Sequence, residues 1–369
     1  MKENKRLESL DAFRGFDMMF IMGLSGIIVA VCKLFPGGAD CALAAQFGHS
    51  AWNGLKFYDM IFPTFLFIAG ISFPFSYGKQ CDLGASRGKI YLKILKRALI
   101  LFALGLVYNG LFRLHLDSLR ICSVLGRIGF AWMFAALLFI NFKPGVRAVI
   151  AAALLLGYWF LCMIPAPDMA GADPLSREGC LVGYIDRTLL GPEHVYSDGV
   201  FDPEGMLSTL PAIVTAMLGM FTGEFVRLPE SRISGNRKAL FLLLTAAVLL
   251  VAGLVWDRWF PINKKLWSST FVLVVGAYSM AMFALFYWLI DVKGWNSWTL
   301  PFKVVGMNSI TIYLAQRMIN IKFTADFLTG GIVELCPEQW GALISKLSYF
   351  ALAWLLLYFL YKRKIFIKV

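Results

Sequence analysis

The 369-residue sequence is poor in charge, because Asp, Glu, Lys and Arg make up only 16% of it. It has three histidines, and its seven cysteines form no CxxC pair and no metal-ligand spacing, so a metal site is not predicted. A nucleotide-binding glycine loop, a repeat of fixed period and a low-complexity segment are also missing. These absences argue against a soluble nucleotide-binding enzyme, a zinc protein and a repeat protein.

Hydrophobic residues, in contrast, make up 59% of the sequence. They form about ten segments of roughly 20 residues, the length that crosses the hydrocarbon core of a bilayer. The expected fold class is therefore all-α, a polytopic transmembrane helix bundle, and the short loops predict that residues 1–369 form a single transmembrane domain. The predicted spans are residues 13–35, 57–77, 96–112, 124–142, 146–164, 206–223, 239–256, 268–290, 304–321 and 343–361.

The net charge of +12 is divided among separate segments, which argues against a nucleic-acid surface. If the spans alternate, the basic segments 1–6, 76–97, 142–147, 224–238 and 361–369 all lie on one side. The positive-inside rule makes that side the cytoplasm and places both termini there. The acidic, Pro- and Gly-rich loop 165–205 is then extracytoplasmic, as is His49. An outer disulfide among Cys41, Cys180 and Cys336 is compatible with this topology, and the sequence does not select a pair.

Ionisable residues at the span ends are candidate functional groups, because charge inside a membrane is costly. The stretch LESLDAFRGFDMM places Asp11 and Arg14 three residues apart, a spacing that suits a helical ion pair. Arg14 has two interpretations, as an anchor to lipid phosphates or as a ligand-binding residue. The first assigns it to the membrane surface, and the second to a site within the bundle.

The stretch GHSAWNGLKFYDMIFPTFLFIAG, residues 48–70, leads directly into the second span. If residues 49–60 are helical, His49, Asn53 and Lys56 share one face and Asp59 lies roughly 15 Å deeper, out of reach of His49. Asp59 then needs another partner. Arg127, near the start of the fourth span, is the predicted one, as a structural pair or as part of a catalytic site.

Further polar residues lie at the sixth, eighth and ninth spans. Asp202, Pro203 and Glu204 have the order of an N-cap and first turn, and the alternative is that a carboxylate holds a cationic acceptor. Lys264 and Lys265 precede the eighth span, where interface anchoring is the simplest interpretation. Asn308 is predicted near the cytoplasmic end of the ninth span.

Six segments in order, SLDAFRGFDMM, the stretch 48–70, LRICSVLGRIG, FDPEGMLSTLPAIVTAMLG, NKKLWSSTFVLVVGA and VVGMNSITIYL, resemble the transmembrane acetyltransferase family related to heparan-alpha-glucosaminide N-acetyltransferase. The resemblance covers residues 9 to about 314 and is to the shorter bacterial type without a lumenal domain. It implies transfer of an acetyl group from cytosolic acetyl-CoA to the amine of a glucosamine-type sugar on the extracytoplasmic side. The active histidine of the family corresponds to His49.

An imidazole suits this chemistry, because it can accept a proton from the attacking amine or itself carry the acetyl group. The indole N–H of Trp52 and the amide of Asn53 are candidate donors to the thioester oxyanion. The expected site residues are His49, Asn53 and Asp59 for catalysis, Arg14, Asn308 and Arg127 for the acetyl-CoA co-substrate, and Trp52, Asp202, Glu204 and Lys265 for the acceptor.

The expected partners are acetyl-CoA, an amino-sugar acceptor, the lipid bilayer and a second copy of the chain in a homodimer. The expected location is a bacterial inner membrane. The competing hypothesis is a transporter or flippase for a sugar or lipid-linked sugar, in which the buried charges line a translocation path and His49 relays protons. Transfer of radiolabel from acetyl-CoA to a sugar amine distinguishes the two hypotheses.

Overall fold

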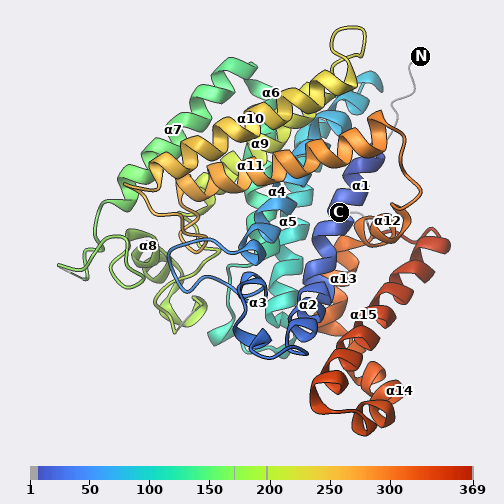
Figure 1. The fold of residues 1–369 in the computed structure, drawn as a ribbon. Coiled ribbons are helices and arrows are strands. Elements are labelled where there is room, and N and C mark those ends of the chain that lie inside the picture. The colour runs from blue at the N-terminus through green and yellow to red at the C-terminus, as the bar shows by residue number, and fades with distance from the viewer. Residues whose placement is uncertain (1–6, 170, 197, 368–369) are drawn as a thin grey trace.

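The computed structural model describes residues 7–169, 171–196 and 198–367, which fold into a bundle of helices (Figure 1). Residues 1–6 and 368–369, which belong to two of the predicted basic segments, lie outside these ranges. The bounds of the α-helices are α1 Glu8–Met19, α2 Ser25–Cys32, α3 Ala42–Gln46, α4 Phe57–Asp82, α5 Arg87–Asn109, α6 Val124–Asn141, α7 Pro144–Cys162, α8 Leu181–Leu190, α9 Thr209–Val226, α10 Gly235–Trp256, α11 Ser269–Tyr287, α12 Leu300–Gly306, α13 Ser309–Met318, α14 Ile321–Leu335 and α15 Glu338–Lys362.

Within the described ranges, eight helical segments are long and apolar enough to cross a membrane. The prediction of a polytopic helix bundle is therefore confirmed. The eight segments are Glu8–Cys32, Phe57–Asp82, Val124–Asn141, Pro144–Cys162, Thr209–Val226, Gly235–Trp256, Ser269–Val292 and Glu338–Lys362.

Two of the ten predicted spans differ from these eight. Residues 96–112 fall largely in α5, which is 23 residues long but begins with the basic stretch RGKIYLKILKR. Residues 304–321 are interrupted, because α12 ends at Gly306 and α13 begins at Ser309. Asn308 is therefore the residue before α13 at a break, and its predicted position at the end of a continuous span is wrong.

The first span is continuous but kinked. A π-helical turn, Phe20–Leu24, joins α1 to α2, and Gly23 within it has φ 136°, a value that residues with a side chain rarely adopt. The Gln316 side-chain amide on α13 donates to the carbonyls of Ile21 and Met22 at 3.3 and 3.4 Å. These two bonds supply donors to carbonyl groups at the distorted turn.

Glycines allow α4 and α9 to pack backbone against backbone. A methyl group on Gly219 would lie 2.0 Å from the carbonyl oxygen of Phe67, and one on Gly223 would lie 2.4 Å from that of Ile71. Small residues four apart give helices this close approach inside membranes. The contact fixes α9 against α4, the helix that follows His49.

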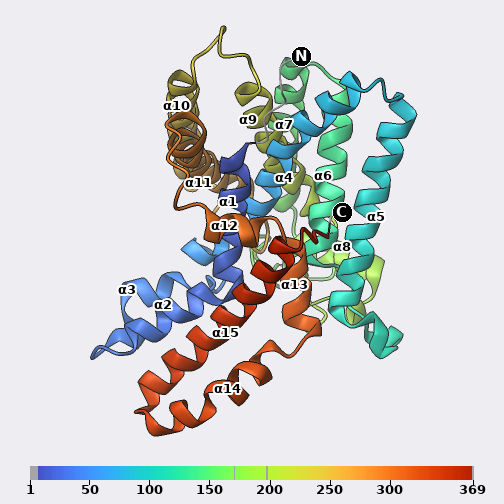
Figure 2. The same cartoon turned by 90° about the vertical axis from the view of Figure 1, so that its right-hand side faces the viewer.

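The long helices alternate in direction, so their ends gather at two faces of the bundle. One face carries residues 163–169, 171–196 and 198–208, and we call it the loop face. There the Trp52 indole donates to the carbonyl of Leu175. The opposite face joins the end of α9 to the start of α7 through Arg147 and Glu224, 2.7 Å apart. We call it the basic face. Figure 2 shows α14 and α15 projecting together beside α2, away from α6 and α7.

Candidate active site

The segment between α3 and α4 places His49 on the loop face without being helical. Lys56 is extended, with φ −118° and ψ 159°, and α4 begins only at Phe57. Gly54 has φ 100° and donates its N–H to the carbonyl of Ile262 at 2.8 Å. The prediction that residues 49–60 are helical is therefore wrong, and His49, Asn53 and Lys56 do not share a helical face.

This non-helical segment folds back so that His49 reaches Asp59. The imidazole Nδ1 lies 2.8 Å from Asp59 Oδ1, which corrects the prediction that the two side chains are too far apart to bond. The Asp59 side chain is fully buried at 0% exposure, whereas the His49 side chain is 54% exposed. A buried carboxylate thus holds an imidazole that faces outward.

Asp59 also fixes the backbone around the histidine. Its Oδ2 accepts from the Ser50 N–H at 3.1 Å, the Ser50 hydroxyl at 2.9 Å and the Lys56 N–H at 3.2 Å. Its Oδ1 receives Lys264 Nζ at 3.2 Å from the segment before α11. We call His49, Ser50, Asp59 and Lys264 the histidine site. It satisfies a buried charge with several hydrogen bonds and one cation.

Lys264 Nζ also lies 3.1 Å from His49 Nδ1. Since a carboxylate only accepts and an ammonium only donates, Nδ1 either carries a proton toward Asp59 or accepts one from Lys264. Only the first arrangement leaves Nε2 with its lone pair available. Burial lowers the pKa of Lys264, and Asp59 offsets only part of this decrease. Nδ1 lies closer to Asp59 Oδ1, at 2.8 Å, than to Lys264 Nζ, at 3.1 Å, which favours the first arrangement.

The other predicted residues near His49 tie neighbouring segments together. Asn53 Oδ1 accepts from Asn263 Nδ2 at 3.0 Å, and the Trp52 N–H donates to Leu175 O at 2.8 Å. Lys265 Nζ donates to Ala51 O at 2.6 Å and lies 5.8 Å from the centre of the Trp52 ring. The oxyanion role predicted for Trp52 and Asn53 stays a prediction, and in this structure both side chains bond within the protein.

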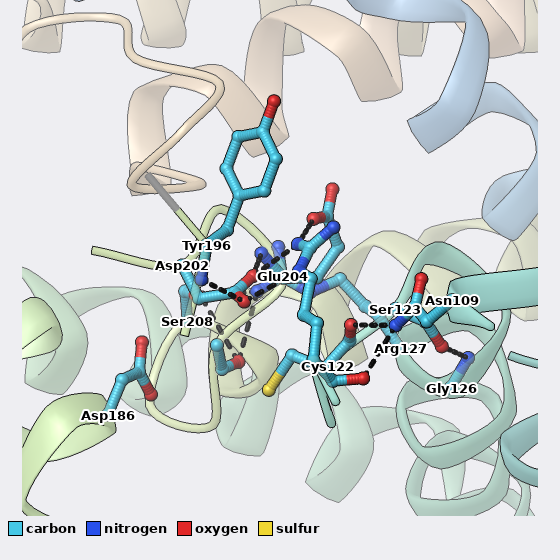
Figure 3. A network of polar contacts seen from close by, with 12 residues as sticks. Asn109, Cys122, Ser123, Gly126, Arg127, Asp186, Tyr196, Asp202, Glu204 and Ser208 are labelled. Atoms are coloured by element: carbon cyan, nitrogen blue, oxygen red, sulfur yellow. Dashed lines mark hydrogen bonds and ion pairs between the residues drawn. The ribbon is translucent and has the colours of Figure 1, made fainter. Parts of the chain in front are cut away.

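A second polar cluster lies on the loop face, and Figure 3 shows Arg127, Asp202 and Glu204 in it. Arg120 Nε and Nη2 donate to the two oxygens of Asp202 at 2.8 and 2.5 Å, and Nη2 also contacts Glu204. Burial alone would lower the pKa of Arg120, but these carboxylates raise it above its usual value. We call Arg120, Arg127, Asp202 and Glu204 the arginine cluster.

The predicted helix-capping role of Asp202 and Glu204 is wrong, because α9 begins at Thr209. Asp202 instead accepts from the N–H groups of Glu204 at 2.9 Å and Tyr196 at 3.2 Å, within the loop itself. Its side chain is 0% exposed. Asp202 is therefore the buried centre of a folded loop, and Arg120 supplies its countercharge.

The predicted pair of Asp59 with Arg127 is also wrong. Arg127 donates to the carbonyl of Gly205 at 3.0 Å and to the hydroxyl of Ser208. Its guanidinium carbon lies 4.9 Å from the centre of the Trp267 ring, which in turn contacts Phe62 of α4. Trp267 thus occupies the space between the two helices, and similar depth in the membrane does not bring the side chains together.

A cavity of about 490 Å³ lies inside the bundle. Its polar lining is Arg14, Ser72, Ser76, Arg97 and Ser309, and Arg14 donates to Ser72 Oγ at 3.1 Å. The predicted ion pair of Arg14 with Asp11 is present at 3.8 Å. Ser76 lies toward the basic face, whereas Leu125, in the first turn of α6, lies toward the loop face. The cavity therefore extends along the bundle, and we call it the basic cavity.

A smaller, apolar cavity of about 60 Å³ shares Phe65, Leu125 and Ile128 with the basic cavity and extends the lining to Phe62 and Tyr313. Asn308, predicted to bind acetyl-CoA, is 1% exposed and adjoins the lining residues Met307 and Ser309. Its side chain is not itself part of either lining.

All seven cysteines lie in the described ranges and are free, so none of the three outer candidates forms a disulfide in this structure. The part of the chain that the structure describes also has no group of three His, Cys, Asp or Glu side chains placed as metal ligands.

Comparison with known proteins gives the same relationship over most of the sequence. Residues 6–163 match a family described as "Domain of unknown function (DUF5009)". Heparan-alpha-glucosaminide N-acetyltransferase of Mus musculus is 28% identical over 418 positions, covering 99% of this chain and 60% of its own length. The Homo sapiens protein of the same name is 27% identical over 430 positions, with the same coverage. The chain is a homologue of this N-acetyltransferase.

The alignments with this acetyltransferase include 99% of the chain, so they cover the segment around His49 and the segment around Lys264. The chain spans 60% of the length of the curated relatives it matches.

Sequence reasoning missed three residues of these sites as partners: Ser50, Lys264 and Arg97. Arg97 was assigned only to a basic segment, although it lies in the predicted span 96–112, where a charge is a functional signal. No local pattern reveals Lys264, because it is 205 residues from Asp59.

Proposed function

We propose that this protein is a transmembrane acetyltransferase that moves an acetyl group from acetyl-CoA to the amine of a glucosamine-type sugar. The observation that carries the proposal is the histidine site, in which a buried Asp59 holds an outward-facing imidazole on the loop face. The basic cavity leads toward that face through the bundle. Homology to a membrane N-acetyltransferase supports the same reaction class.

In the direct route, Nε2 of His49 removes a proton from the attacking amine as its nitrogen bonds to the thioester carbonyl carbon. The carbon–sulfur bond then breaks, and the CoA thiolate leaves. Asp59 keeps the Nδ1 proton in place and stabilises the imidazolium that forms, as in other carboxylate–imidazole pairs. The Trp52 N–H reaches the oxyanion only if its bond to Leu175 breaks, whereas the contact of Asn53 with Asn263 uses its Oδ1 and leaves its N–H group out.

In the covalent route, Nε2 itself attacks the thioester carbonyl and releases the thiolate, leaving an acetylated imidazole. The sugar amine then attacks that acetyl group, and the histidine is regenerated. Both routes need the same tautomer, with the proton on Nδ1 facing Asp59. Both also need the thioester to arrive beside Nε2.

The basic cavity suits the donor substrate. Arg14 and Arg97 offer guanidinium groups to phosphates, and the apolar walls suit a pantetheine arm. Asn308 adjoins this lining and is assigned to the donor with them. Arg127 donates to Gly205 and Ser208 instead, so we do not retain its predicted contact with acetyl-CoA.

The acceptor would bind on the loop face. The Trp52 ring, flanked by Lys265, offers an aromatic surface of the kind that packs against sugars. Of the two carboxylates, Glu204 is 12% exposed and Asp202 is buried, so Glu204 is the better partner for an ammonium group. Asp202 would act by holding Arg120.

The decisive experiment measures transfer of radiolabel from acetyl-CoA to glucosamine by purified protein in detergent. Wild type should transfer label, and His49→Ala should lose at least about 100-fold of the rate while still binding acetyl-CoA. His115→Ala, which changes an exposed histidine outside the site, is the control. Residual transfer by His49→Ala that rises at high pH favours the direct route, because the amine is then already deprotonated. Wild-type rates in His49→Ala would place the site elsewhere, and movement of sugar without transfer of label would support the transporter hypothesis.

We also propose that the basic face is cytoplasmic, in a bacterial inner membrane. The basic segments and the positive-inside rule support this orientation. Single cysteines at Ser86 and Asp198, in a variant without the native cysteines, should react with an impermeant reagent from opposite sides. Reaction from the same side would overturn the topology and the position of His49 with it.

A further inference from the structure

A second cavity, of about 370 Å³, lies where α6 begins, apart from the basic cavity. One part of its lining is polar and includes Ser123, Arg127 and Glu204, and the other part is formed by Phe102, Phe130 and Phe134. We call it the lateral cavity. Leu125 and Ile128, which line the basic cavity on α6, are absent from its lining. The two cavities therefore contact different sides of the same helix.

Arg127 is the only arginine in this lining, and its charge is poorly compensated. It is 2% exposed, and Nε and Nη1 have no hydrogen-bond partner among the described residues. Arg147 also has two unpartnered nitrogens, but its Nη2 forms an ion pair with Glu224 at 2.7 Å, and it does not line the lateral cavity. Arg127 donates only to neutral oxygens, those of Gly205 and Ser208.

The backbone adds to the positive potential in the polar part of the cavity. The first turns of two helices of 18 residues each, α6 and α9, contribute Gly126 and Thr209 to the lining. Helix N-termini carry partial positive charge and favour anions. Glu204 is the one carboxylate in the lining, and Arg120 already binds it. A buried arginine beside two helix starts is therefore complementary to an anionic group.

The apolar part of the cavity is open to the hydrocarbon region. Phe134 is 45% exposed on the membrane-spanning helix α6 and lies seven residues beyond Arg127, about two turns or roughly 10 Å deeper. Phe130 lies between them, and Phe102 faces the cavity from α5. Charge near the helix start and aromatic rings toward the bilayer centre match the order of headgroup and acyl chain in a lipid.

We propose that the lateral cavity binds a membrane lipid with an anionic headgroup, taken from the leaflet at the loop face. The headgroup oxyanion contacts Arg127 and the first turns of α6 and α9, and an acyl chain lies along the three phenylalanines. Arg127 and the three phenylalanines take no part in the proposed acetyl transfer, and the site shares only Glu204 with the region proposed for the acceptor. It therefore stands or falls without the proposed function.

The test measures lipid retention by native mass spectrometry of the full chain, with phosphatidylglycerol and phosphatidylcholine of identical acyl chains as probes. Wild type should retain phosphatidylglycerol preferentially. Arg127→Gln should reduce that retention by at least about tenfold, the loss expected for one charge-assisted contact. Arg147→Gln is the matched control, because it changes a buried arginine that does not line the lateral cavity.

Met206→Trp is a second test that leaves Arg127 in place, because Met206 lines the cavity and is 49% exposed. It should block retention, whereas Leu189→Trp, at an exposed position outside the lining, should not. If Arg127→Gln does not fold, this pair decides the outcome. Equal retention of the two lipids, or unchanged retention in Met206→Trp, would overturn the proposal. Displacement of the lipid by an equal concentration of glycerol 1-phosphate would show that the site selects a free phosphate instead.

Discussion

Asp59 and Asp202 are both fully buried on the loop face, yet their partners differ. Asp202 is bound by Arg120, whose side chain is 24% exposed and whose Nε and Nη2 donate to two carboxylates. Asp59 is bound by His49, whose side chain is 54% exposed and whose second ring nitrogen is not engaged by Asp59. Burial of a carboxylate therefore does not identify an active site. The accessibility and chemical type of its partner, here an imidazole and not a guanidinium, separate a structural pair from a reactive one.

The largest expected effect comes from breaking the structural pair. Arg120→Leu leaves the buried Asp202 and the partly buried Glu204 without their cation, and should lower the free energy of unfolding by about 3–5 kcal/mol. Chemical denaturation in detergent measures this change. Lys322→Leu, which breaks the exposed pair with Asp326, is the control and should leave stability unchanged. If Arg120→Leu is as stable as wild type, the pair of Arg120 with Asp202 is not structural, and the distinction between Asp202 and Asp59 fails.

Breaking the reactive pair should affect transfer more than folding. Asp59→Asn keeps a side chain of similar shape but weakens the hold on the Nδ1 proton, so the rate of acetyl transfer should fall about 100-fold. The pH dependence of the rate should change as well, which a purely structural role for Asp59 would not produce. Asp40→Asn, an exposed residue outside the site, serves as the control. An unchanged pH profile would contradict the role given to Asp59.

Asp186 is a third buried carboxylate, and unlike Asp59 and Asp202 it has no ion pair among the described residues. Burial raises the pKa of Asp186 from 3.8 to about 7, and the N–H of Met206 donates to its Oδ1 at 2.8 Å. The folded state therefore keeps a proton that the unfolded state loses near pH 4, so stability should fall as the pH rises from about 4 to about 7. Asp186→Asn should raise the melting temperature by several degrees at pH 8 and change it little at pH 4. Equal shifts at both pH values would contradict this assignment.

The smallest effect is expected at Ser50, which donates twice to Asp59. Ser50→Ala removes the hydroxyl bond and keeps the backbone bond, so the free energy of unfolding should decrease by about 1 kcal/mol. Acetyl transfer should decrease severalfold at most. Loss of transfer as large as that in Asp59→Asn would mean that the hydroxyl itself takes part in the reaction.

The sequence predicts the helices well because long apolar segments have few alternatives in a membrane. The second span begins at Phe57, as predicted from the hydrophobic stretch. The error concerns the preceding residues, which were assumed to continue the helix. Gly54 at φ 100° and its bond to Ile262 turn the chain instead, and neither the turn nor its distant partner has a local signal.

The predicted charge partners failed for a related reason. Asp59 and Arg127 both lie in the first turn of their helices, α4 and α6, but Arg127 bonds to Gly205 and Ser208 instead. Depth along a span can be counted from the sequence, whereas rotation about the helix axis depends on packing. Here the Trp267 ring packs beside both Arg127 of α6 and Phe62 of α4.

The distance in sequence between His49 and Lys264 has a consequence for the order in which the chain is made. His49 and Lys264, whose side chains meet at the imidazole Nδ1, are 215 positions apart. At translation rates of about 5–20 residues per second, His49 and Asp59 are synthesised roughly 10–40 s before Lys264. Asp59 therefore spends that interval without its lysine partner, while α5 to α10 are still being made. A ribosome stalled before Lys264 would leave a nascent chain with the histidine but without a complete site, so the site is completed late in biosynthesis.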